Sequence, residues 1–204
     1  MSKRAARGAG LDWGLAEETG KAIRWLSACN LPGAEALAKV LLLNQNKKYE
    51  ELAPDSTEDT WSAPSGRLCP LICGSTMSDL SEEIAQGKAI TLRSVVKPLI
   101  LLGYLVHVTK QTQKSVRLSW TQAELMVSSA GITLRGENTD ALYANDVQCN
   151  VTESSGEFTP FGVIGREVED SAWQTLTDFM TRYLAPNTDE SRLVGAGAGF
   201  NDND

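Results

Sequence analysis

The chain has 204 residues, of which 42% are hydrophobic and 22% are charged. The hydrophobic fraction is sufficient for a core, and the charged fraction is too low for a disordered chain. The formal net charge of −7 argues against a nucleic-acid-binding protein, because contacts with phosphates need clustered Lys and Arg. The length favours a single domain over residues 1–204.

The first ten residues, MSKRAARGAG, are basic but lack an apolar run, so they do not match a signal peptide. The longest apolar run, residues 98–108, is too short for a bilayer, which takes about 20 residues to span. We therefore expect a cytoplasmic protein without a membrane partner. There Cys29, Cys69, Cys73 and Cys149 should be free thiols.

Residues 1–52 are expected to form a helical front. Within it, a glycine-rich turn around Asp12 precedes a strong helix pattern, and Asp12 is placed to cap that helix. A second helix is predicted over residues 34–51, after the stop signal of residues 30–33. The short turn between the two helices predicts an antiparallel hairpin. The side chains predicted to face the core from the first of these helices are Leu15, Thr19, Ala22, Ile23 and Leu26.

Residues 53–66 contain Pro, Gly, Asp and Ser, which predict a loop. Residues 67–184 are predicted to be mixed α+β. Their most hydrophobic segment, residues 95–113, favours a buried central helix, with a strand as the alternative. It contains the only histidine, His107, which we expect to be a partly buried structural residue. Before this helix we expect a strand at 68–73, a helix at 78–86 capped by Ser78 or Ser81, and a strand at 89–96.

After the central helix, short alternating segments separated by turn residues predict an antiparallel meander. A loop at 158–165 and a C-terminal helix at 171–184, capped by Asp170 or Ser171, should follow. The strands of the meander are expected at residues 115–120, 124–128, 132–135 and 146–152.

A single histidine excludes metal sites built from several histidines. The pair Cys69 and Cys73 favours core packing over a zinc site, because the other two cysteines lie far away in sequence. The sequence identifies no catalytic residue, no metal site and no cofactor, and it leaves the oligomeric state open.

The glycine-rich turn allows two interpretations. The favoured one is a connection between two helices that pack with closely spaced backbones. The alternative is a loop whose backbone N–H groups, at the start of a helix, bind an anion. The tail, residues 185–204, contains GAGAG followed by an acidic end. We expect this tail to lie in a narrow groove against the N-terminal region, with its acidic end near Arg4, Arg7 or Arg24; a frayed terminus is the alternative.

The candidate ligand-binding residues therefore come from both ends of the chain. They are chosen for charge and aromatic character near the glycine-rich turn and the tail. The candidates are Arg7, Trp13, Glu18, Arg24, Trp25, Arg192 and Asp202.

The segments ARGAGLDWGLAEETGKAIRWL and ESR-x-x-GAGAG-x-NDND resemble a bacterial family of about 200 residues that is known only as a domain of unknown function. The resemblance extends over nearly the whole chain and is sharpest at these two ends. It implies no activity, cofactor or partner. It also implies further residues before Met1 in such a family.

We expect a small-molecule-binding or accessory protein of bacterial metabolism, with its site where the glycine-rich turn meets the tail. One alternative is a metabolic enzyme that uses Glu18 or Asp202 for acid/base chemistry. Another is a subunit whose tail inserts into a protein partner. A pocket lined by Trp13, Trp25 and Arg24 would favour binding, whereas a pocket around a Glu18 with a raised pKa would favour the enzyme.

Overall fold

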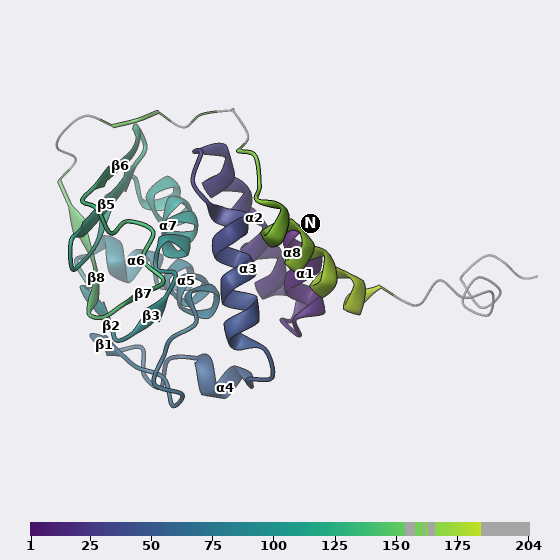
Figure 1. Ribbon diagram of the computed structural model, residues 1–204. Helices are drawn as coiled ribbons and strands as arrows, with labels where there is room; N and C mark the ends of the chain where they lie inside the picture. Colours follow the sequence, from purple (N-terminus) through teal and green to yellow (C-terminus); the bar gives the residue numbers. More distant parts are fainter. Residues whose placement is uncertain (154–157, 161, 163–165, 185–204) are drawn as a thin grey trace, which may run out of the picture.

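The computed structural model describes residues 1–153, 158–160, 162 and 166–184. Its helices lie in layers on one side of a six-stranded sheet (Figure 1). The fold class is α+β, as the sequence predicts. The helices are α1 (Ser2–Gly8), α2 (Trp13–Ala28), α3 (Gly33–Asn44), α4 (Tyr49–Leu52), α5 (Pro70–Asp79), α6 (Ser81–Ala85), α7 (Leu99–Thr112) and α8 (Asp170–Tyr183).

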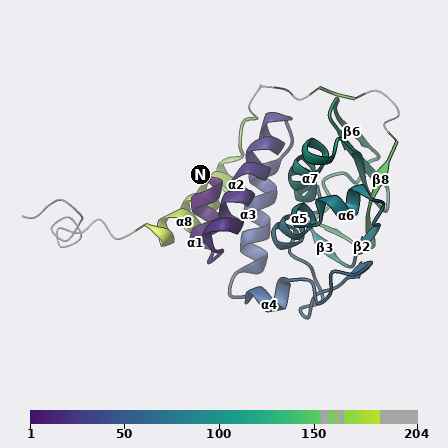
Figure 2. The ribbon, with the colours of Figure 1, turned by 180° about the vertical axis from the view of Figure 1, so that it is seen from behind.

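The order of the layers is the same in the two opposite views (Figures 1 and 2). Helices α6 and α7 pack on the sheet, and α5 packs on α7. Helices α2 and α3 follow on the other side of α7, and α1 and α8 lie farthest from the sheet. One cluster of buried hydrophobic residues extends through these layers from Ala5 to Phe179.

The main sheet has the strand order β1-β2-β8-β4-β5-β6. The predicted meander is confirmed for β4, β5 and β6, which pair in sequence order and in antiparallel fashion. The fourth predicted strand, β8, is also antiparallel, but it pairs with β4 and not with β6. The sheet is not wholly antiparallel, however, because β1 pairs with β2 in parallel. The strands are β1 (Thr60–Trp61), β2 (Ile90–Leu92), β4 (Ser115–Trp120), β5 (Ala123–Ser128), β6 (Gly131–Arg135) and β8 (Val147–Thr152), with β3 (Val95–Val96) and β7 (Tyr143–Ala144) in a separate pair.

Helix α7 is the buried central helix that the sequence predicts. Every residue from 99 to 106 is buried, because this uncharged run lies between the sheet and α2. Gly103 allows the close approach, since a Cβ atom there would lie 2.7 Å from the carbonyl oxygen of Ala22. His107 is exposed, so its predicted partial burial is wrong: it lies on the solvent side of the helix.

Helix α2 begins where the sequence predicts. The Asp12 carboxylate accepts a hydrogen bond from the Leu15 N–H at 3.1 Å, and this bond satisfies one of the free donors of the first turn. The predicted core face is confirmed for Thr19, Ala22, Ile23 and Leu26, which are buried, while Leu15 is half-buried.

Several predicted boundaries in the first half are wrong for local backbone reasons. The helix expected over 34–51 ends at Asn44 and resumes only as the short α4, because Asn46 adopts a left-handed conformation with φ of 63°. The strand expected at 89–96 is divided into β2 and β3 by Ser94, which has φ of 53°. The expected loop 53–66 contains β1, in which Trp61 is fully buried.

The segment 68–73 was expected to be a strand, but helix α5 begins within it. Pro70 occupies the first turn of this helix, where its missing N–H costs nothing. The helix predicted at 78–86 is shorter, since α6 covers Ser81–Ala85 and neither Ser78 nor Ser81 caps it. Ser78 lies within α5 and donates its hydroxyl hydrogen bond to the Gly74 carbonyl.

Helices α1 and α8 pack against each other through Gly8. A Cβ atom on this residue would lie 1.6 Å from the Phe179 carbonyl oxygen, so only glycine fits. This close contact is made with α8, whereas the sequence predicts close packing between the two helices that the glycine-rich turn connects, α1 and α2. Helix α8 has no side-chain cap bond, so neither Asp170 nor Ser171 caps it. The tail, with the groove predicted for it, lies outside the described residues.

In the described part of the chain, no helix combines the length and the apolar character that crossing a membrane requires.

Candidate functional site

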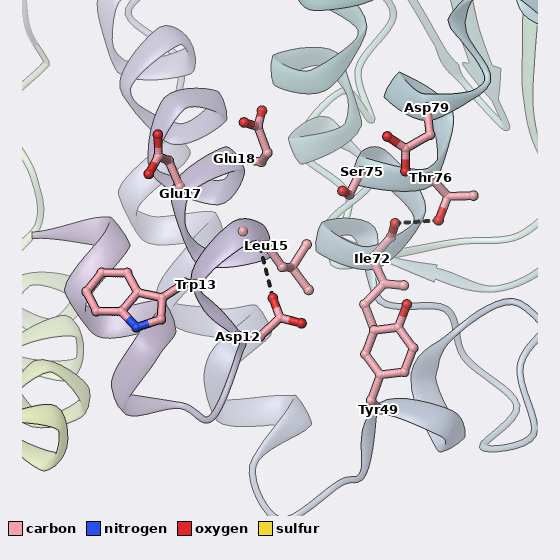
Figure 3. A pocket seen from close by; sticks show the side chains of 11 residues that line it. Asp12, Trp13, Leu15, Glu17, Glu18, Tyr49, Ile72, Ser75, Thr76 and Asp79 are labelled. Carbon is pink, nitrogen blue, oxygen red and sulfur yellow. Dashed lines mark hydrogen bonds between the residues drawn. The ribbon is translucent and has the colours of Figure 1, made fainter.

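A cavity of about 570 Å³ lies between the start of α2, Tyr49 at the start of α4, and one face of α5 (Figure 3). Asp12 and Leu15 come from the α2 side, and Ser75 and Asp79 come from α5. The wall of α2 is fixed by the cap at Asp12. The wall of α5 is fixed by the burial of its opposite face.

The α5 wall follows from helical periodicity. Leu71 and Cys73 are buried, whereas Ser75 and Asp79, four residues apart, lie on the same side of the helix and line the cavity. The Thr76 hydroxyl donates to the Ile72 carbonyl at 3.0 Å and is therefore engaged with its own helix. Of the α5 side chains, Ser75 and Asp79 are thus best placed to contact a ligand.

The cavity is strongly acidic. Its lining includes the carboxylates of Asp12, Glu17, Glu18 and Asp79, and none of the lining residues that the structure describes is Lys or Arg. Tyr49 responds to this charge: burial, and then the negative charge of Asp12, raises the pKa of its hydroxyl. A field of this sign attracts cations and repels anions.

Two of the carboxylates are held by lysines outside the cavity. Glu17 pairs with Lys3 at 2.9 Å, and Glu18 pairs with Lys21 at 2.8 Å. The hydrogen bond and charge of Lys3, with a smaller contribution from Lys21, lower the pKa of Glu17, so this carboxylate stays ionised. Among the described residues, neither Asp12 nor Asp79 forms an ion pair.

A metal ion is not the occupant that this geometry favours. Within the described residues, no three His, Cys, Asp or Glu side chains converge closely enough to hold one. The carboxylates instead line opposite sides of a broad cavity (Figure 3), as an organic cation with several donors would require. An anion at the start of α2 is also disfavoured, because the Asp12 carboxylate already accepts the first-turn N–H.

A smaller cavity of about 200 Å³ adjoins the acidic one and shares Asp12, Leu15 and Tyr49 with it. Its far side is formed by Leu52 and by Asn44, whose side-chain oxygen is buried and has no hydrogen-bond partner among the described residues. This annex offers an apolar wall and one free acceptor next to the carboxylates.

A further cavity of about 190 Å³ lies on the other side of Glu18, between α2, α5 and α7. Trp25 and His107 line it, together with Lys21 and Lys110. Glu18 lines both this cavity and the acidic one. Glu18 is therefore the lining residue that the two cavities share.

The candidate residues from the sequence are dispersed. Glu18 and Trp25 do share a cavity, as their seven-residue spacing predicts. Trp13 lies at the rim of the acidic cavity and points away from α5 (Figure 3). Arg7 lies outside it, with its guanidinium 5.0 Å from the Trp13 ring centre. Arg24 is exposed and lines none of the three cavities described here.

Arg192 and Asp202 lie outside the described residues, as does the predicted junction of the turn with the tail. The ligand-binding role of all these residues stays a prediction. Sequence reasoning missed Ser75 and Asp79, because it placed a strand at the start of α5. It also missed Tyr49, which it placed inside a longer helix.

The family comparison supports the resemblance for the first part of the chain. A family model described as "Protein of unknown function (DUF3726)" matches residues 1–69. Searches of curated proteins and of solved structures returned no match. The matched segment contains the α2 and Tyr49 walls of the acidic cavity but not the α5 wall, which begins at Pro70.

Proposed function

We propose that this protein binds a small organic cation, an amine or a guanidine compound, in the acidic cavity between α2 and α5. It would thus be a small-molecule-binding or accessory protein. The observation that supports the proposal is the 570 Å³ cavity whose lining contains four carboxylates and neither Lys nor Arg among the described residues. The site retains the glycine-rich turn expected from the sequence, but its second wall is α5.

The chemistry of the lining fits such a ligand. Asp12 and Asp79 accept hydrogen bonds from N–H groups, and a charge-assisted bond is stronger than a neutral one. Tyr49 and Ser75 add hydroxyl groups, and Leu15 contributes an apolar surface for a carbon chain. A mixture of apolar wall and few polar groups is typical of small-molecule sites.

Binding is better supported than acid/base catalysis. A catalytic carboxyl group works best when its pKa lies near the operating pH, whereas Lys3 lowers the pKa of Glu17. Glu18 is held by Lys21 at 2.8 Å. The four cysteines are free, which fits a reducing compartment such as the cytoplasm.

Calorimetric titration of the full chain with agmatine and with spermidine tests the proposal. Asp79→Asn should weaken agmatine binding about tenfold, because a hydrogen bond to a charged group contributes about 1.5–3 kcal/mol. Glu82→Gln is the matched control, since Glu82 is an exposed carboxylate on the next helix outside the cavity. Equal affinities for the Asp79→Asn and Glu82→Gln variants, or no binding of either cation by the folded protein, would reject the site.

A further inference from the structure

The cavity beyond Glu18 has a charge opposite to that of the acidic one. Its charged lining residues are Glu18, Lys21 and Lys110, together with the imidazole of His107. Lys21 is already neutralised, because it pairs with Glu18 at 2.8 Å and with Glu17 at 3.5 Å. Lys110 is exposed and forms no ion pair within the described part of the chain.

His107 and Lys110 are three residues apart on α7, so they lie on the same face of the helix. Both are exposed, and both line this cavity next to Trp25. One ammonium group and one imidazole on the same wall supply donors for an anionic group, and the indole supplies a flat apolar side.

The floor of this cavity is closely packed. Gly103 places α7 against α2, with a would-be Cβ only 2.7 Å from the Ala22 carbonyl oxygen. Below it, the buried hydroxyl groups of Thr19 and Tyr104 are hydrogen-bonded at 3.0 Å. The two helices therefore hold the wall of Lys110 at a fixed position relative to Glu18, and such preorganisation lowers the cost of binding.

The two cavities also adjoin along the same helices. On α5, Asp79 lines the acidic cavity and the adjacent Ser78 lines the other one. On α2, Glu18 lines both. A ligand that crosses Glu18 would meet, in order, the unpaired carboxylates, the shared carboxylate and the unpaired Lys110.

From this order of charges we infer that the ligand is a zwitterion, namely an α-amino acid with a basic side chain. The basic group lies among Asp12 and Asp79, and the α-carboxylate is bound by Lys110 and His107. The α-ammonium group lies at Oε2 of Glu18, because Oε1 already accepts from Lys21. The inference rests on the proposed function, because it extends the same site from a cation site to a site for both charges.

Pairs of ligands that differ only in a carboxylate distinguish the inferred zwitterion site from the proposed cation site. L-Arginine and agmatine differ only in the carboxylate, and L-lysine and cadaverine differ in the same way. In calorimetric titrations of the full chain, we expect L-arginine to bind at least about tenfold more tightly than agmatine. Lys110→Gln should remove most of this difference by weakening L-arginine while leaving agmatine unchanged.

Lys114→Gln is the control, since Lys114 is an exposed lysine just beyond the end of α7 and is not part of this cavity. The carboxylate site is wrong, and the cation site stands, if agmatine binds and L-arginine binds no more tightly. The same holds if agmatine binds and Lys110→Gln leaves the affinity for L-arginine unchanged. If the folded protein binds neither member of either pair, both the zwitterion and the proposed function are rejected.

Discussion

Among the helix pairs that meet through a glycine, one in the core and one at the edge bring a glycine against a backbone carbonyl. In the core, Gly103 of α7 lies against the Ala22 carbonyl of α2; at the edge, Gly8 of α1 lies against the Phe179 carbonyl of α8. The approach is closer at the edge, where a Cβ would lie 1.6 Å from the oxygen, against 2.7 Å in the core.

The surroundings of the two pairs differ more than their geometry. Helix α7 is buried on nearly all sides, whereas α8 exposes Trp173 by 51% and Tyr183 by 37%. Close backbone contact therefore has different roles in the two places. In the core it adds to extensive apolar burial, while at the edge it adds to a smaller apolar contact, made by Ala172, Leu176 and Phe179 of α8.

The largest effect is expected in the core. Leu102 is fully buried in α7, and Leu102→Ala should lower the free energy of unfolding by about 2–5 kcal/mol, because it removes apolar contacts and leaves a cavity. Urea unfolding followed by circular dichroism measures this loss. A loss under about 1 kcal/mol would contradict the central role of α7.

At the edge, Gly8→Ala should separate α1 from α8 without unfolding the core. The added methyl group would meet the Phe179 backbone, and no side-chain rotation can relieve this clash. Over-packing of this kind costs about 1–3 kcal/mol. Hydrogen exchange should therefore accelerate in α1 and α8 but not in α7.

Gly14 provides the control for this variant. It lies in the first turn of α2 with nothing within 4 Å of a would-be Cβ. Gly14→Ala should leave exchange in α8 unchanged and should stabilise α2 slightly, since alanine is the better helix former. Equal exchange in the two variants would show that contact at Gly8 does not hold α8.

The smallest effect is expected for the exposed ion pair between α1 and α2. Lys3 lowers the pKa of Glu17, so the pair stabilises the fold above the ordinary glutamate pKa of 4.5 and ceases to do so as the pH falls through the lowered pKa. Lys3→Met should show a small loss of stability at pH 7 that disappears on acidification. Lys39→Met, at an exposed lysine of α3, should show no such pH-dependent loss.

The sequence predicts the parts of the fold that depend on a long or regular pattern. Asp12 and the following periodicity identify α2, and the uncharged run from Leu99 identifies α7. The meander is likewise visible in the alternation of its strands. Each of these signals is local and extends over several turns or strands, so tertiary packing does not override it.

For the candidate site, the sequence predicts only the wall formed by α2. A short apolar run such as residues 68–73 does not distinguish strand from helix, and this ambiguity concealed the face with Ser75 and Asp79. Positive φ angles at Asn46 and Ser94 depend on contacts that the sequence does not display. Glu18 and Trp25 were found because helical spacing alone brings them together.

The cysteines have a practical consequence for measuring how this molecule opens. Burial raises the pKa of Cys69, just before α5, and of Cys73 within α5, and it raises that of Cys149 in β8 to about 12. Their thiolates therefore form only when the surrounding structure separates. Cys29, which follows α2, is half-buried. Alkylating reagents followed by mass spectrometry therefore report local opening at two separate places of the wild-type chain, without an engineered label, and the half-buried Cys29 is the reference thiol.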